Sequence, residues 1–156
     1  MPSQYGGVSQ SLPLISSNNN FQNLGVNFMS NQAYKNLPLV YSCSGCSNVA
    51  QLANDIAIKL DQEKIAEMSC IAGVGGGVRP LVKTAKSNRE IIVLDGCPLT
   101  CAKHCLENQQ VPITQHIDIS KLGVKKKYHE KCNQETSSRV WNEVLEIIKN
   151  KITSDS

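Results

Sequence analysis

A chain of 156 residues is long enough for one domain with a buried core and gives no reason to propose two. An apolar fraction of 40% is ordinary for a globular protein, and a formal net charge of +3 is too weak to indicate a nucleic-acid-binding protein. No apolar run approaches the ~20 residues of a membrane-spanning helix, and the first residues lack the blocks of a secretory signal. We therefore expect a cytoplasmic protein without nucleic-acid or membrane partners, whose seven cysteines favour metal or thiol chemistry over disulfides.

The first 36 residues differ from the rest in composition. Lys35 is the only charged residue among them, and Ser, Asn, Gln and Gly dominate. Such a segment buries too little apolar surface to offset the entropy that it would lose on ordering. We predict that residues 1–36 form a flexible polar extension and that residues 37–152 form the folded domain.

In the predicted domain, short apolar runs alternate with helical patterns. The predicted strands cover residues 37–41, 65–72, 91–94 and, with period-2 alternation, 111–119. The predicted helices cover residues 49–60, 78–86 and 98–108, and a last helix carries an apolar stripe of Val140, Trp141, Val144, Leu145, Ile148 and Ile152. This alternation is typical of an α/β fold with a small parallel sheet of about four strands and helices on both faces. Right-handed crossovers favour the flavodoxin-like strand order 2-1-3-4.

Five cysteines lie where the predicted strands end. Cys43 and Cys46 follow the first strand, Cys70 lies near the end of the second, and Cys97 and Cys101 follow the third. The loops after parallel strands meet at the carboxyl edge of a sheet, and in the order 2-1-3-4 the switch point lies between strands one and three. The Cys-x-x-Cys pair after the first strand should therefore face the Cys-x-x-x-Cys pair after the third.

The local sequence at these cysteines favours thiolates. Pro98 suits the first position of a helix, which predicts Cys97 as the N-cap, and both helix N-termini and Cys-x-x-Cys turns lower thiol pKa values. A structural zinc ion binds four such ligands in tetrahedral geometry. We predict a Zn²⁺ site built from four of the five cysteines, without a choice among them. Cys105, one helical turn after Cys101, could extend the set, whereas Cys132 is predicted to be a packing residue.

Two other functions remain open for the same cysteines. They could hold an iron–sulfur cluster. They could also form a thiol–disulfide redox enzyme, with Cys43 and Cys46 as the reactive pair and Cys97 or Cys101 as the resolving partner. The sequence leaves open whether the protein is an enzyme, because no Ser-His-Asp set and no paired carboxylates stand out.

Other conspicuous residues are predicted to have structural or surface roles. The run Gly73–Gly77 follows a strand but lacks the third glycine of the dinucleotide fingerprint, which predicts a tight turn. The run Lys125–Lys127, with Lys131 close by, is predicted to be a solvated loop. The histidines are predicted to be packed or exposed rather than ligands: His104, His116 and His129.

Three cysteine motifs together resemble a known family, the DGC domain, over about residues 37–145. The motifs are Cys43-Ser44-Gly45-Cys46-Ser47, Met68-Ser69-Cys70-Ile71-Ala72-Gly73 and Asp95-Gly96-Cys97-Pro98-Leu99-Thr100-Cys101-Ala102. The family is described as zinc-binding because of its potential chelating cysteines. The resemblance implies Cys43, Cys70, Cys97 and Cys101 as ligands, with Cys46 as a fifth thiol.

Overall fold

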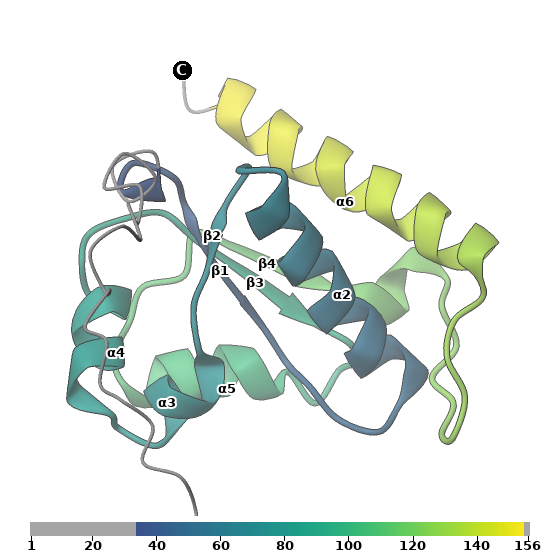
Figure 1. Ribbon diagram of the computed structural model, residues 1–156, viewed down its shortest axis with the longest axis horizontal. Coiled ribbons are helices and arrows are strands. Elements are labelled where there is room, and N and C mark those ends of the chain that lie inside the picture. Colours follow the sequence, from purple (N-terminus) through teal and green to yellow (C-terminus); the bar gives the residue numbers. More distant parts are fainter. Residues whose placement is uncertain (1–33, 155–156) are drawn as a thin grey trace, which may run out of the picture.

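The computed structural model describes residues 34–154, and side chains as far as residue 151. A four-stranded parallel sheet lies at its centre in the order β2-β1-β3-β4 (Figure 1). The strands are β1 (Leu39–Ser42), β2 (Glu67–Met68), β3 (Ile91–Asp95) and β4 (Gln115–Asp118). The predicted α/β class and strand order are confirmed, and every residue of β1 and β3 is buried, as strands covered on both faces require.

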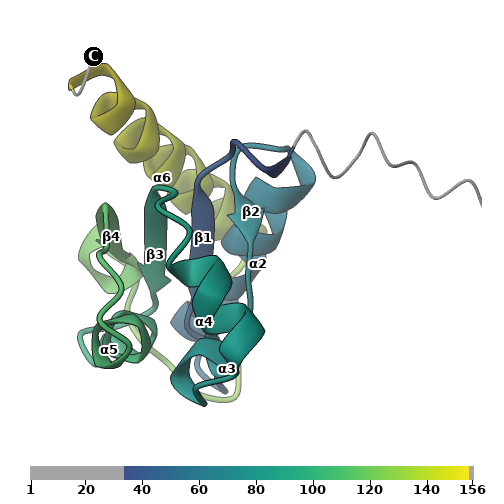
Figure 2. The ribbon, with the colours of Figure 1, turned by 90° about the vertical axis from the view of Figure 1, so that its left-hand side faces the viewer.

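Helices cover both faces of the sheet (Figures 1 and 2). On one face lie α2 (Asn48–Gln62) and α6 (Gln134–Ser154). On the other lie α3 (Ile71–Gly75), α4 (Arg79–Ala85) and α5 (Cys101–Asn108), while the 3-10 helix η1 (Ile119–Leu122) follows β4. This arrangement follows from right-handed crossovers that run first toward β2 and then back toward β4. Among the described residues, no helix is both long and apolar enough to cross a membrane.

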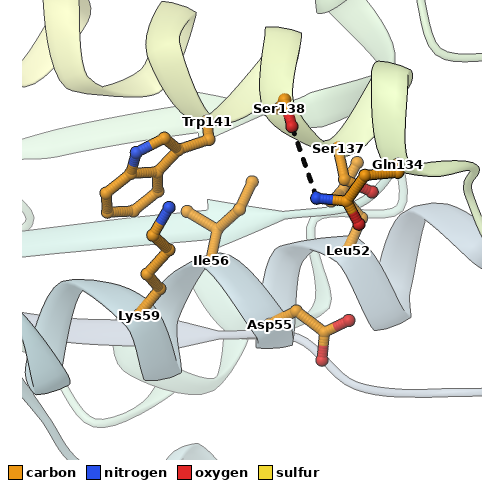
Figure 3. Close-up of a pocket in the computed structure, with 8 residues that line it drawn as sticks. All are labelled: Leu52, Asp55, Ile56, Lys59, Gln134, Ser137, Ser138 and Trp141. Carbon is orange, nitrogen blue, oxygen red and sulfur yellow. Dashed lines mark hydrogen bonds between the residues drawn. The ribbon is translucent and has the colours of Figure 1, made fainter.

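The packing of α6 on α2 combines an apolar floor with a polar rim (Figure 3). Leu52 and Ile56 of α2 are buried beneath Trp141 of α6. The Nζ atom of Lys59 lies 4.1 Å from the centre of the Trp141 ring, which is a cation–π contact. These side chains hold the C-terminal helix against α2.

The register of the sheet aligns the ends of its two central strands. Ser42, the last residue of β1, pairs with Leu94 of β3, and the Cys43 amide donates to the Leu94 carbonyl at 3.0 Å. Asp95, the last residue of β3, pairs with Asp118 of β4. The segments that follow β1 and β3 therefore leave the sheet side by side.

The opposite edge of the sheet is closed by Arg89. Its guanidinium donates to the carbonyls of Leu37 at 2.7 Å and Tyr34 at 2.9 Å, and it pairs with Glu67 at 2.6 Å. The fold thus reaches back to Tyr34, three residues before the predicted start of the domain. Residues 1–33 of the predicted polar extension lie outside the described residues.

Several predicted boundaries were wrong. The fourth strand, predicted over residues 111–119, covers only Gln115–Asp118. The second strand is not eight residues long: β2 is two residues, and the chain then turns at Cys70, whose sulfur accepts from the Gly73 amide at 3.4 Å and caps α3. The predicted glycine turn lies partly inside α3, where a side chain at Gly73 would clash with Leu81. The helix predicted from Pro98 begins instead at Cys101, so Thr100 rather than Cys97 is its N-cap.

Candidate functional site

Cys43 is fixed directly against the end of β3. It is 8% exposed, and its sulfur accepts a hydrogen bond from the Gly96 amide at 3.1 Å. A side chain at position 96 is impossible without movement, because a Cβ there would lie 2.6 Å from the carbonyl carbon of Val49 and 2.7 Å from the amide nitrogen of Ala50. The glycine of the Asp-Gly-Cys motif thus lets the start of α2, Cys43 and β3 pack together.

The environment of Cys43 disfavours its thiolate. Burial raises its pKa to about 11, although the Gly96 amide works in the opposite direction by hydrogen bonding to the sulfur. The negative potentials of Asp95, Cys101 and Cys97 raise the pKa further. Cys43 is therefore a neutral thiol at physiological pH unless a cation lies beside it.

Asp95 fixes the helix that carries Cys101. The carboxylate is 1% exposed and accepts from the backbone amides of Ala102 at 2.9 Å and Lys103 at 3.2 Å. Its Oδ2 atom also lies 3.1 Å from Nε2 of His116 in β4. The Thr100 side chain does not cap α5, and Asp95 accepts the first amides of the helix instead. Asp95 therefore fixes the position of Cys101 relative to the end of β3.

Cys97 and Cys101 lie on either side of a tight turn. The Thr100 amide donates to the Cys97 carbonyl at 3.1 Å, and Thr100 adopts a positive φ of 46°. Cys97 is partly buried and Cys101 is exposed. The Nζ atom of Lys126 lies 3.4 Å from the Cys97 sulfur, and hydrogen bonds with Tyr128 and Cys97 raise the Lys126 pKa. A fixed positive charge therefore faces one thiol of the site.

The remaining thiols are distributed around this centre. Cys46 is exposed on the loop before α2, and Cys70 is exposed at the start of α3. Cys105 is partly buried where α5 packs against α3, because the absence of a side chain at Gly75 leaves room for its sulfur. Burial, followed by the potentials of Cys101 and Asp95, raises the Cys105 pKa.

The structure brings some of the predicted ligands together more closely than others. Cys97 and Cys101 both lie close enough to Cys43 to affect its charge, and all seven cysteines are free thiols. Cys46 and Cys70 follow β1 and β2 at the same edge of the sheet, and both are exposed. Across residues 34–151, no three Cys, His, Asp or Glu side chains are already arranged to hold a metal ion. Cys132 lies apart, with its sulfur 3.9 Å from the Asn48 carbonyl.

Sequence reasoning missed the three residues that shape this site. Lys126 was assigned to a solvated loop, His116 to a packed or exposed position, and Gly96 was noted only as part of the Asp-Gly-Cys motif. The period-2 pattern of β4 placed His116 on an edge strand correctly, and adjacency of β4 to β3 was the signal that could have paired it with Asp95. No local pattern indicates the contact of Lys126 with Cys97, because 29 positions separate them.

Comparisons with known proteins agree with the cysteine motifs. The family model described as "DGC domain" matches residues 39–144. The "Anaerobic and virulence modulator AnvM" of Pseudomonas aeruginosa is 54% identical over 112 residues, which are 72% of this chain and 86% of that protein. No solved structure matches the chain. The chain belongs to the DGC domain family.

Proposed function

We propose that this protein binds a zinc ion through cysteine thiolates at the carboxyl edge of its sheet. The observation that carries the proposal is the contact of the Cys43 sulfur with the Gly96 amide, because it joins the loops after β1 and β3 at the position of Cys97. Thiolates are preferred ligands of structural zinc, and the edge carries five cysteines that can become thiolates on binding.

The surroundings of these sulfurs fit a metal–thiolate group. Amide and ammonium donors stabilise thiolate charge, and such donors come from Gly96 to Cys43 and from Lys126 to Cys97. The raised pKa of Cys43 is compatible with binding, since a divalent cation favours deprotonation of a coordinating thiol outright.

Cys43, Cys97 and Cys101 form the proposed core of the ligand set, with Cys46 or Cys70 as the fourth ligand. Binding requires the sulfurs to draw closer than they lie now. Cys46, Cys70 and Cys101 are exposed, so we expect their side chains to rotate about χ1 toward the ion when it binds. When bound, zinc would cross-link the segments after β1 and β3 and stabilise the folded state.

Elemental analysis of protein purified under reducing conditions tests the proposal. We expect about one zinc per chain in the wild type and loss of it in Cys97→Ser. Cys132→Ser is the matched control, because its thiol lies beside Asn48 rather than in the cluster, and it should retain the metal. Failure of the wild type to take up zinc after reconstitution would refute the proposal.

A second proposed function is a response to oxygen through the same cysteines, and the name of the relative AnvM favours it. Iron–sulfur clusters and reactive thiols are both altered by oxidation. Anaerobic purification separates these alternatives from zinc: visible absorption of the protein with bound iron would support a cluster. Reversible Cys43–Cys46 oxidation, with the metal content unchanged, would support a thiol–disulfide pair.

A further inference from the structure

A basic hollow of about 380 Å³ lies beside the N-terminus of α6, apart from the predicted zinc ligands. It is formed by the segment 123–133 and the first turns of α6. Its lining includes one acidic residue, Glu130, and four cationic residues: Lys125, Lys127, Lys131 and Arg139. We call these four cationic residues, with the hollow between them, the basic basin.

The basin is held in shape by one buried side chain. Asn48, 5% exposed at the start of α2, donates to the Lys125 carbonyl at 3.1 Å and accepts from the Lys127 amide at 2.7 Å. The backbone amide of Asn48 donates to the Lys127 carbonyl at 3.0 Å, and Ser47 forms an antiparallel bridge with Tyr128. The three-lysine run is therefore an exposed loop, as its composition predicts, and its backbone is anchored to the start of α2 by Asn48.

The contacts of this loop separate the three lysines. Lys125 and Lys127 line the basin, whereas the Nζ atom of Lys126 lies 3.4 Å from the Cys97 sulfur, outside it. The fold thus places the charges of Lys125 and Lys127 in the basin and the charge of Lys126 beside Cys97.

Much of this charge is not neutralised inside the protein. Lys127 pairs with Glu130 at 2.8 Å, and Arg139 contacts Glu143 and the Leu122 carbonyl. Lys125 and Lys131 have no ion pair within the part of the chain that the structure describes. The N-terminus of the 21-residue helix α6, capped by Asn133, adds its positive dipole end to the same hollow.

The shape and lining of the basin limit the class of ligand. Its volume is near the lower end of the ~300–1,000 Å³ typical of ligand pockets, which indicates a small molecule. Among the described residues, no aromatic ring lines it, so these residues offer no surface on which a nucleobase could stack. Clustered ammonium and guanidinium groups are the usual partners of phosphate oxygens.

We propose that the basic basin binds a small anion carrying a phosphate group. The ligand is held by Lys125, Lys131 and Arg139, with Lys127 as a further cation beside Glu130. This binding site is independent of the zinc proposal, since none of these residues belongs to the thiol cluster.

Titration of the full chain with inorganic phosphate, followed by amide chemical shifts in NMR spectra, tests the proposal. Sodium chloride of equal ionic strength serves as the reference. We expect saturable shifts centred on segment 123–136 and an affinity reduced about tenfold or more in the double variant Lys125→Gln/Lys131→Gln. The control, Lys83→Gln/Lys86→Gln at α4, changes the net charge equally and should alter the affinity less than about twofold.

Three outcomes would overturn the proposal. If sodium chloride caused the same chemical-shift changes as phosphate, the changes would reflect ionic strength alone. Equal losses in both double variants would mean that net charge, and not the basin, attracts phosphate. Tighter binding of a single-stranded oligonucleotide, lost in the basin variant alone, would assign the surface to nucleic acid instead.

Discussion

The carboxylate of Asp95, the last residue of β3, and the imidazole of His116, in the neighbouring strand β4, lie 3.1 Å apart. The same carboxylate accepts the first amides of α5. This one buried side chain therefore joins two strands and a helix immediately before Cys97, which gives the aspartate of the Asp-Gly-Cys motif a structural role.

Replacement of Asp95 by Asn should destabilise the protein by about 1.5–3 kcal/mol, because a buried, charge-assisted network is lost. Urea denaturation measures the free energy of unfolding. Asp55→Asn, at an exposed position on α2, is the control and should cost less than about 0.5 kcal/mol. Equal stability of the Asp95 variant and the wild type would show that the network contributes nothing.

Gly96→Ala should destabilise the fold by about 2–3 kcal/mol, because the added methyl group meets the backbone of Val49 and Ala50, which cannot rotate away. Gly123→Ala is the informative comparison. Its φ is +74° and nothing lies within 4 Å of an added Cβ, so only backbone strain of about 1 kcal/mol is expected. The thermal unfolding temperature of Gly96→Ala should be well below that of Gly123→Ala, and the reverse order would contradict the proposed packing.

The metal-free protein should lose stability in alkaline solution. In the unfolded chain Cys43 ionises near its ordinary pKa of 9.0, whereas burial holds its thiol protonated in the folded state to about pH 11. The stabilisation is fully present below pH 9 and is lost as the pH rises to 11, by about 2–3 kcal/mol. Urea titrations of wild type and Cys43→Ala across this range should show a shallower decline in the variant. If the stability of the wild type and of Cys43→Ala declined in parallel with pH, Cys43 would not be the group responsible.

Asn48→Ala should loosen the segment that carries the three lysines. Removal of the side chain breaks its hydrogen bonds to Lys125 and Lys127, worth about 2–3 kcal/mol together. We expect the Lys127 amide to exchange with solvent at least about tenfold faster. Asn54→Ala, on the same helix, is the control. Unchanged exchange at Lys127 would mean that Asn48 does not anchor the segment.

The sequence was sufficient to predict the topology, for a physical reason. Alternation of continuous apolar strands with amphipathic helices, together with right-handed crossovers, leaves few arrangements of a parallel sheet. Cys43 and Cys97 become neighbours as a consequence of that order, so their convergence was also predictable.

The errors arose where distant contacts override local preference. Glycines disfavour helix, yet α3 includes Gly73 and Gly75 because Leu81 and Cys105 leave no room for side chains there. Pro98 indicated a helix start, but the Asp95 carboxylate sets the start at Cys101. The anchoring of Lys125 depends on Asn48, 77 positions earlier, which no local pattern contains.

X-ray absorption at the zinc edge tests the central claim most directly. For protein purified under reducing conditions or reconstituted with zinc, thiolate binding predicts sulfur neighbours at about 2.3 Å as the dominant shell. In Cys97→Ser at least one sulfur should be lost from that shell. A shell of nitrogen and oxygen alone at about 2.0 Å, or no zinc retained by the wild type, would contradict the account.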